Sequence, residues 1–213
     1  MNEEDFVKAI EEMKKSSPSR NFIESVDIAV NLKDINLQDP SKRFQLEVKL
    51  PHPINKNVKI CVFAEGAQLI EAKEAGAEKV IDKSELENII RDKKLSKKLA
   101  QQYDFFVASA PLMPIIGRSL GKYLGPRGKM PKPVPPTAPI KPVIENLKQT
   151  AKVRLRQSPV IHTRIGTVNM EPQQLAENAM AVLRAIERKL EKGENNIRSI
   201  YIKTTMGPAI KVK

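Results

Sequence analysis

A segment from Gly117 to Pro136 combines glycines, prolines and cations and carries no acidic side chain. Glycines can arrange backbone N–H groups around an anion, and lysine and arginine side chains can neutralise phosphates. The segment therefore suits either a phosphate cradle for a nucleotide or a cationic surface for a polyanion. Its residue order does not match the phosphate-binding loop G-x-x-x-x-G-K followed by Ser or Thr, and its glycines do not directly follow an apolar strand as a dinucleotide site requires.

We predict that the stretch PLMPIIGRSLGKYL, in which the segment begins, is helical and that the proline-rich remainder is a rigid, exposed basic loop, because its prolines stiffen the chain and keep it out of a sheet. A loop of this kind can contact a polyanion such as RNA. A packed connection whose cations only aid solubility is the alternative. The candidate secondary contacts are Arg118, Lys122, Arg127, Lys129 and Lys132.

The stretch KTTMGP, near the last residues of the chain, offers uncharged groups that suit RNA. The hydroxyls of Thr204 and Thr205 can bond to ribose 2′-hydroxyls, the groups that distinguish RNA from DNA. Met206 can lie flat against a sugar or a base because its side chain is flexible and polarizable. Gly207 lets a nucleic-acid backbone approach closely, and Pro208 ends the strand, which presents these groups at a strand end. An ordinary strand stop is the alternative interpretation.

Phe22 and a set of cations extend the same hypothesis. Phe22 precedes the first predicted strand in a chain with only 4% aromatic residues, so it can stack on a base, with an anchor for the core as the alternative. Cations in or near the predicted strands can neutralise phosphates and fix the register of a bound RNA, although each fits equally well as a solvated surface charge. These cations are Lys42, Arg43, Arg154, Arg156 and Arg164.

Metal and catalytic chemistry are disfavoured. The two histidines, His52 and His162, and the one cysteine, Cys61, show no metal-site spacing, so we expect the histidines to make polar contacts or satisfied packing. Cys61 lies in the apolar run VKICVF and is expected to be a small buried hydrophobe. No Ser-His-Asp set and no paired carboxylates mark an active site. We therefore predict no enzyme activity, no metal and no cofactor.

Composition favours a nucleic-acid partner. The 213 residues include 37 Lys and Arg against 25 Asp and Glu, a formal charge of +12, which suits nucleic acid or an anionic surface. One cysteine allows no internal disulfide and fits a reducing setting. The acidic, amphipathic start does not resemble a secretory signal, and no apolar run approaches the roughly 20 residues that span a bilayer. We expect a soluble, unprocessed, cytoplasmic protein with no membrane partner.

The helices and strands that must position these residues are predicted from two spacings of apolar residues, one typical of helices and one typical of strands. Residues 3–15 show helical spacing, whereas residues 26–32 and 43–50 alternate between apolar and polar side chains as half-buried strands do. The polar connection between these two strands suggests that they pair antiparallel. The same style returns after residue 150, where AKVRLR, PVIHTRIG and IRSIYIKTTM predict strands and residues 171–192 predict a long amphipathic helix.

The middle of the chain follows a different pattern. VKICVF and DFFVAS are nearly continuous apolar runs, EKVI is shorter, and the helical stretches GAQLIEAKEAG and SELENIIRDKKLSKKLA alternate with them. This alternation indicates βαβ units with a parallel sheet. We predict an α/β and α+β protein: a discontinuous, split α+β first domain (residues 1–53 and 151–213) with an inserted Rossmann-like, three-layer α/β second domain (residues 54–150).

Several motifs together resemble one family. RNFIESVDIAVNL, the strand that ends in VKLPHP, LGKYLGPRGKMPKP, IHTRIG and TTMGPAIKVK are similar to the family of large-subunit ribosomal protein number one over nearly the full length. LGPRGKMP and TTMGP are specific, and the glycine-proline loop resembles the archaeal branch. The resemblance implies two RNA partners: the large-subunit rRNA at the mobile ribosomal stalk near the tRNA exit site, and a similar structure in the protein's own mRNA, whose occupation represses translation.

The resemblance also implies how the parts divide this work. The first domain is expected to hold the principal RNA site, and the second to add weaker contacts to another RNA segment or to the E-site tRNA. The ribosome-bound protein is expected to assist release of deacylated tRNA, and the free protein to be a monomer without a cofactor. The residues leave one alternative open, a nucleotide-binding enzyme that uses the Rossmann-like insert.

The resemblance places Phe22, Glu24 and Ser25 opposite the Thr-Met-Gly stretch. Bacterial members commonly carry a lysine just before the phenylalanine, and this chain has Asn21, which makes Arg20 the expected local cation. The predicted RNA contacts of the first domain are Phe22, Glu24, Ser25, Arg43, His52, Arg154, Arg156, His162, Arg164, Thr204, Thr205, Met206 and Gly207.

Overall fold

A computed structural model of the chain describes residues 3–18, 20–54 and 58–212 and belongs to the mixed α/β class. The chain divides into two compact units: unit 1 comprises Met1–Lys56 and Gln149–Lys213, and unit 2 comprises Asn57–Lys148. The predicted boundary between the first and the second domain, after residue 53, adjoins residues 55–57, which lie outside the described residues. That the units are independent domains stays a prediction.

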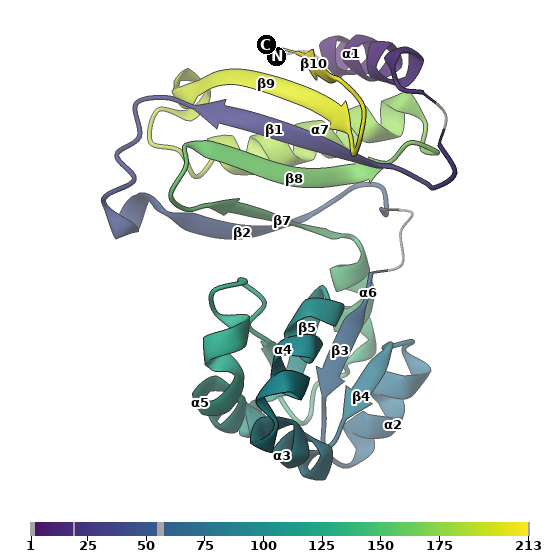
Figure 1. Ribbon diagram of the computed structural model, residues 1–213, viewed down its shortest axis with the longest axis vertical. Coiled ribbons are helices and arrows are strands. Elements are labelled where there is room, and N and C mark those ends of the chain that lie inside the picture. The colour runs from purple at the N-terminus through teal and green to yellow at the C-terminus, as the bar shows by residue number, and fades with distance from the viewer. Residues whose placement is uncertain (1–2, 19, 55–57, 213) are drawn as a thin grey trace. The chain divides into compact units, whose positions relative to one another are not determined.

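Unit 1 combines antiparallel strands with two long helices (Figure 1). Four strands form one sheet in the order β10-β9-β1-β8, and β2 pairs with β7. Two short 3-10 turns, Pro40–Lys42 and Gly193–Asn196, lie in the connections. The helices are α1 (Glu3–Ser16) and α7 (Pro172–Glu187), and the strands are β1 (Ser25–Leu32), β2 (Phe44–Lys49), β7 (Thr150–Leu155), β8 (Val160–Thr167), β9 (Ile197–Thr204) and β10 (Ala209–Lys211).

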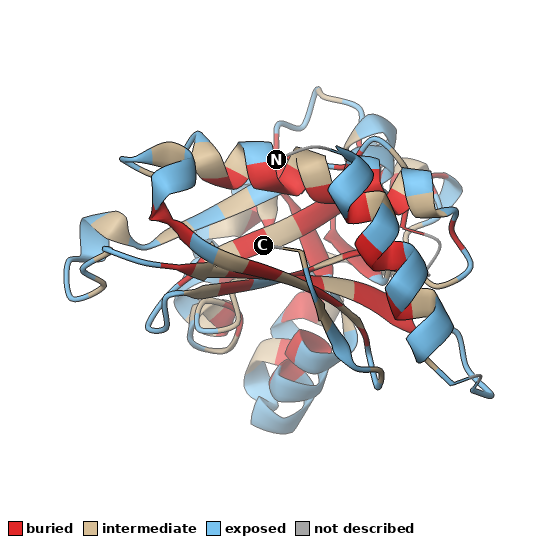
Figure 2. Ribbon diagram, turned by 90° about the horizontal axis from the view of Figure 1, so that it is seen from above, coloured by how far each residue is buried: buried red, intermediate tan, exposed pale blue. Residues whose placement is uncertain are grey.

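The predicted alternation fixes which side of each strand faces the core of unit 1. In β1, Val26, Ile28, Val30 and Leu32 are buried, and the residues between them are half-buried. Helices α1 and α7 contact each other, and they pack on this buried side, α1 against β9 and β10 and α7 against β8, β7 and β2. Figure 2 shows the result, with buried positions in red on the sides of helices that meet strands and exposed positions in pale blue on the outer sides.

The predicted pairing of the first two strands is wrong. Strand β1 lies between β8 and β9, and β2 pairs with β7. Alternation determines which face of a strand is buried but leaves its neighbour open, because any strand with the same period can complete the ladder. In this chain the neighbours of β1 come from segments more than a hundred residues later.

Unit 2 is a parallel sheet between two layers of helices. Its strands lie in the order β4-β3-β5-β6, and each neighbouring pair is parallel, which confirms the predicted parallel sheet. A 3-10 turn, Ala110–Leu112, precedes the fourth helix. The strands are β3 (Ile60–Phe63), β4 (Lys79–Ile81), β5 (Phe105–Ser109) and β6 (Lys132–Val134), and the helices are α2 (Ala67–Glu74), α3 (Lys83–Arg91), α4 (Lys93–Gln102), α5 (Met113–Leu124) and α6 (Lys141–Lys148).

Both faces of this sheet are buried, because alternate residues of the same strands enter different cores. Cys61 and Phe63 of β3 pack with residues of α3, α4 and α5, whereas Ile60 and Val62 pack with residues of α2 and α6. Every residue of β3 and β5 is therefore buried, as expected for parallel strands with helices on both sides.

Two local predictions about unit 2 need correction. The charged stretch after residue 83 is two helices, because Asp92 ends α3 and caps α4 by accepting a hydrogen bond from the Lys94 N–H at 2.7 Å. The helix predicted for PLMPIIGRSLGKYL is confirmed as α5, but the proline-rich loop after it does not stay out of a sheet, because its later part forms β6. Pro133 lies in β6, which is an edge strand and therefore tolerates a residue without an N–H.

Candidate RNA interface

Hydrogen bonds join the start of β1 to the end of β9, two segments that are about 180 residues apart. The Met206 N–H donates to Glu24 Oε1 at 2.9 Å. The Thr205 N–H donates to the Ser25 carbonyl at 3.0 Å, and the Ser25 N–H donates to Thr205 Oγ1 at 3.1 Å. The structure thus brings together Glu24, Ser25, Thr205 and Met206, which the family resemblance placed opposite each other. We call these four, with Phe22, Ile23, Thr204 and Gly207, the strand-end cluster.

The strand-end cluster exposes apolar side chains over a buried carboxylate. Phe22, Ile23 and Met206 are 54%, 59% and 61% exposed, whereas Glu24 is 5% exposed. Exposed aromatic and thioether groups held on a fixed backbone can pack against bases and sugars. Ile23 was not predicted as a contact. The sequence carried a signal for its exposure, because Ile23 is out of phase with the alternating buried residues of the following strand.

Two members of the cluster face the protein. The Thr204 side chain is fully buried, and its Oγ1 accepts a hydrogen bond from the Gly207 N–H at 2.9 Å and lies 3.2 Å from Ser17 Oγ. A Cβ at Gly207 would lie 2.3 Å from Thr204 Oγ1 and 2.5 Å from Ser17 Oγ. The absence of a side chain at Gly207 is therefore required by the protein's own packing. The predicted contacts of Thr204 and Gly207 with RNA stay predictions, and in this structure both residues shape the turn that carries Met206.

A hollow of about 520 Å³ adjoins the cluster. Its lining includes Phe22, Ile23 and the predicted local cation, Arg20, whose Nε lies 3.9 Å from Glu24 Oε1. Lys14 also lines it, and burial lowers the pKa of this ammonium although the charge of Glu171 opposes the effect. The hollow combines an aromatic side chain with two cations, which is a combination that suits a nucleotide.

The predicted arginines divide into two groups. Arg164 lies on β8 opposite Asp27, near the strand-end cluster. Arg43, Arg154 and Arg156 line a different hollow of about 460 Å³. In that hollow, burial lowers the pKa of the Arg154 guanidinium and the nearby charge of Arg156 lowers it further, while Arg43 Nε donates to the Leu37 carbonyl at 2.9 Å.

The second hollow lies at the far end of the sheet of unit 1. The turn after Arg156 leads to the start of β8, where Val160 lies opposite Asn31 near the end of β1, whereas the strand-end cluster is at the start of β1. Strand β1 has eight residues, so the two ends are about 25 Å apart. The predicted RNA contacts of unit 1 therefore do not all lie in a single site.

The two histidines also lie apart. The His52 Nε2 atom is 2.7 Å from Glu177 Oε2 on α7, and the backbone of His52 exchanges hydrogen bonds with the Asn178 side chain. His162 is exposed on β8, opposite Ala29. In the described residues, no group of three or more His, Cys, Asp or Glu side chains is arranged to hold a metal ion. Cys61 is fully buried as predicted, and burial raises the pKa of its thiol.

The predicted secondary contacts of unit 2 have different surroundings. Arg118 and Lys122 are exposed on α5, whereas Arg127 is half-buried and donates to the Tyr123 carbonyl at 3.0 Å. Lys132 is half-buried in β6. Lys129 faces the protein, and its Nζ donates to the carbonyls of Ala100 and Tyr103 at the end of α4. Lysine at this place compensates the negative end of the helix dipole.

No described helix is long and apolar enough to cross a lipid bilayer. This finding concerns residues 3–18, 20–54 and 58–212 only.

Comparison with known proteins gives a consistent result. The model of the ribosomal protein L1p/L10e family matches residues 10–208. The chain is 54% identical to the large ribosomal subunit protein uL1 of Pyrococcus horikoshii over 97% of this chain and 94% of that protein. It is 52% identical to the uL1 protein of Methanopyrus kandleri, over 100% of this chain and 99% of the relative, and 49% identical to that of Methanothermobacter thermautotrophicus, over 99% of each.

Proposed function

The chain belongs to the ribosomal protein L1p/L10e family, a family of structural proteins and not of enzymes, and we propose that it binds the large-subunit rRNA at the mobile stalk near the tRNA exit site. Membership in a ribosomal family supports a place in the large subunit with rRNA as a partner. It also removes the ground for the alternative of a nucleotide-binding enzyme.

The strand-end cluster is the observation that carries the proposal of a specific RNA site. Three exposed apolar side chains, Phe22, Ile23 and Met206, lie on backbone that Glu24 and Thr205 fix by hydrogen bonds. The backbone that carries them is held by these hydrogen bonds before RNA binds, so binding orders the side chains without the further entropy loss of ordering a loop. Sequence-specific proteins commonly recognise RNA by stacking and by 2′-hydroxyl contacts, which are contacts that such a surface can make.

The predicted residues then contribute to RNA binding in different ways. Phe22 and Met206 pack against bases or sugars, and the Thr205 hydroxyl, which already exchanges hydrogen bonds with the Ser25 backbone, accepts one from a ribose 2′-hydroxyl through its remaining lone pair. Glu24 and Ser25 lie at the rim of the RNA contact, and their main role is to hold the turn that carries Met206. Thr204 and Gly207 hold the same turn. The cations of both hollows neutralise phosphates and fix the position of the RNA. His52 is a polar contact at the edge of the interface, and His162, which is exposed on β8, contributes to RNA binding from the outer face of the sheet.

The proposal extends to three further partners and to the arrangement of the chain. The same site binds a similar structure in the protein's own mRNA and represses translation. The exposed cations of unit 2, Arg118 and Lys122, contact a second RNA segment or the E-site tRNA and assist its release. Units 1 and 2 act as two domains with the second inserted in the first, and the free protein is a monomer, which light scattering on the RNA-free chain tests.

The deciding experiment measures binding of the full chain to a folded fragment of the large-subunit rRNA and, side by side, to the leader of its own mRNA at several salt concentrations. Phe22→Ala is expected to lower both affinities by roughly 5- to 100-fold, because stacking on one aromatic side chain stabilises a bound base by about 1 to 3 kcal/mol. Equal affinity of the variant and the native protein for both RNAs contradicts the strand-end site.

The matched control is Ile70→Ala. Ile70 is a 66% exposed apolar residue on α2 of unit 2, and its replacement is expected to leave RNA binding unchanged. If the mRNA leader does not bind while the rRNA fragment does, the repressor role fails and the ribosomal role stands.

A further inference from the structure

We propose that the outer face of the four-stranded sheet of unit 1 is a second RNA surface that binds single-stranded RNA, separate from the strand-end cluster. Helices α1 and α7 pack on the other face of this sheet. We call the outer face the open sheet face. Its residues are Asp27, Ala29 and Asn31 of β1, Val160, His162 and Arg164 of β8, Arg198, Ser199, Tyr201 and Lys203 of β9, and Ala209 and Lys211 of β10.

Two aromatic rings flank the centre of the open sheet face. Ala29 of β1 lies directly opposite His162 on one side and Tyr201 on the other. Directly opposite residues of neighbouring antiparallel strands are about 5 Å apart, so the two rings begin about 10 Å from each other. The side chain of Ala29 is a single methyl group, which leaves the floor between the rings low. Bases can lie on such a platform because every base has a face that stacks on an aromatic ring.

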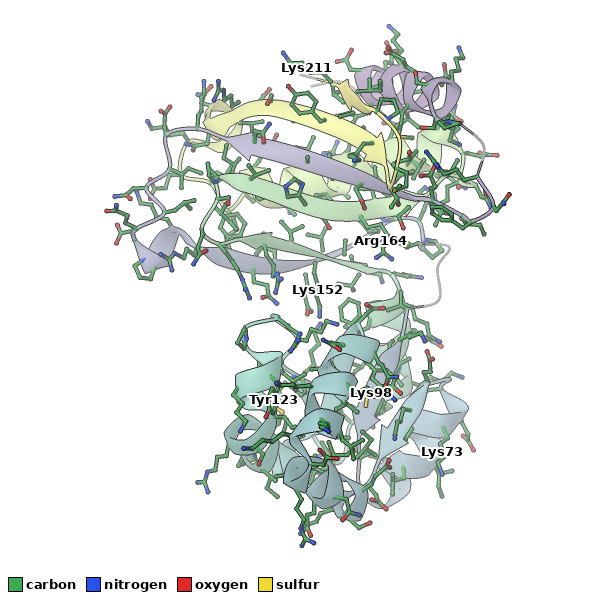
Figure 3. The ribbon with its side chains drawn as sticks, in the orientation of Figure 1. Lys73, Lys98, Tyr123, Lys152, Arg164 and Lys211 are labelled. Carbon is green, nitrogen blue, oxygen red and sulfur yellow. The ribbon has the colours of Figure 1, made fainter. Side chains whose placement is uncertain are left out.

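The charge of the face suits a polyanion. Four cations, Arg164, Arg198, Lys203 and Lys211, share it with one carboxylate, Asp27. Figure 3 shows Arg164 and Lys211 on this part of the molecule, in a view in which α7 lies behind the strands. Cations at the margins of an aromatic platform can track a phosphate backbone while the bases stack between them.

A hollow at one end of the face adds groups that can form hydrogen bonds with a base. It encloses about 350 Å³, and its lining includes Asn31, Ser199, Tyr201 and Arg198. The Asn31 Nδ2 donates to Ser199 Oγ at 2.8 Å, which fixes both polar groups beside the Tyr201 ring. A fixed amide and a hydroxyl next to an aromatic ring provide a donor and an acceptor for the edge of a stacked base.

This arrangement differs from the strand-end cluster in place and in chemistry. The strand-end cluster lies where β1 begins and β9 ends, and it presents one aromatic, one aliphatic and one thioether side chain on a shaped turn. The open sheet face uses two rings on the pleated surface of β8 and β9, flanked by cations. A flat platform selects unstacked, single-stranded bases, so we assign it to a single strand and not to the folded junction.

The test is binding of a fluorescent ten-nucleotide oligouridine to the full chain in low salt, followed by anisotropy. Tyr201→Ala is expected to weaken binding by roughly 5- to 100-fold, and Tyr201→Phe, which keeps the ring, is expected to bind as the native chain does. His162→Ala, at an exposed position that does not contribute to the core, is expected to weaken binding as well. The matched control is Tyr123→Ala, which removes a half-buried tyrosine on α5 of unit 2 whose ring lies 5.1 Å from Lys122 Nζ.

The proposal is overturned if oligouridine does not bind, or if both Tyr201→Ala and His162→Ala bind it as the native chain does. It is also overturned if Phe22→Ala weakens oligouridine binding as much as Tyr201→Ala, because the oligonucleotide then occupies the strand-end cluster. Binding of the rRNA fragment by Tyr201→Ala is measured in parallel. Retained rRNA affinity together with lost oligouridine affinity supports two separate sites, and failure of the strand-end site alone leaves the open sheet face standing.

Discussion

Units 1 and 2 both combine helices with a four-stranded sheet, but they differ in how many faces of that sheet are covered. In unit 1 the helices pack on one side, and the strands alternate between buried and half-buried residues. In unit 2 the strands β3 and β5 are buried throughout, because helices cover both sides. A sheet covered on one face keeps the other face and its strand ends available for binding, whereas a sheet covered on both faces offers only helices, loops and edges.

The two units also differ in where their cations lie. In unit 1, Arg164 and Lys203 stand on the sheet itself and are held in register with Asp27 between them. In unit 2 the two exposed cations that were predicted to bind RNA, Arg118 and Lys122, lie on α5, and Lys129 serves the fold by bonding to the end of α4. We therefore expect specific RNA affinity to reside mainly in unit 1.

The largest effect is expected for the accessibility of Cys61, and it tests whether the units unfold separately. Cys61 is fully buried and burial raises the pKa of its thiol, so a thiol reagent should modify it at least about 1000-fold more slowly in the folded chain than in urea. A chain with Cys61→Ala and Val30→Cys reports on unit 1, where Val30 is equally buried. Modification of the two thiols at different urea concentrations supports two domains, and coincident curves contradict them.

Replacement of an exposed methionine by aspartate compares the two units in RNA binding. Met206→Asp is expected to lower affinity for the rRNA fragment by at least about 100-fold, because a carboxylate placed against phosphates is a like-charge contact that costs several kcal/mol. Met130→Asp is the matched control, since Met130 of unit 2 is 45% exposed and Met206 is 61% exposed. Equal losses in the two variants, measured by filter binding, mean that net charge and not the strand-end cluster explains the effect.

Glycine-to-alanine changes should shift stability in opposite directions in the two units. Gly207→Ala is expected to destabilise unit 1 by about 1 to 3 kcal/mol, because the new Cβ lies 2.3 Å from Thr204 Oγ1 and 2.5 Å from Ser17 Oγ. Gly117→Ala in α5 meets nothing within 4 Å and is expected to stabilise unit 2 by roughly 0.5 to 1 kcal/mol. Urea titrations measure both. Loss of stability in the two variants alike removes the packing explanation for Gly207.

The two roles of cations in unit 2 can be separated. Lys129→Ala removes the hydrogen bonds to the end of α4 and is expected to destabilise the protein by about 1 kcal/mol without changing the affinity for RNA. Arg118→Ala, at an exposed position of α5, should change stability by less than about 0.5 kcal/mol. Thermal unfolding and RNA binding are measured on both variants. A loss of stability in Arg118→Ala together with unchanged stability in Lys129→Ala contradicts the assignment of Lys129 to the fold.

The smallest effects concern the phosphate contacts at the far end of the sheet. Arg156→Ala is expected to reduce the slope of log affinity against log salt by about 0.7 to 0.9, because one fewer counterion is released. Arg91→Ala, at an exposed position at the end of α3 in unit 2, is expected to leave the slope unchanged. An unchanged slope in Arg156→Ala places this hollow outside the RNA interface.

The sequence by itself predicted most of the helices and strands, although not β6 and β10, and it predicted which side of the alternating strands is buried. Alternation marked Val26, Ile28 and Val30 as core residues, and the continuous apolar run around Cys61 indicated a strand with both faces covered. Family motifs near both ends of the chain brought Phe22 and Met206 into one predicted site. These inferences succeed because period and residue type are local properties of the chain.

Only the tertiary structure decided which strands are neighbours and which way individual polar groups point. It placed β8 and β9 beside β1, turned Thr204 and Lys129 toward the protein, exposed Ile23, and put Arg43 and Arg156 at the opposite end of the sheet from Met206. The identity of a threonine or a lysine does not reveal whether its polar atoms face solvent or bond to another segment of the protein. That choice depends on contacts between residues far apart in the chain, which a local pattern does not encode.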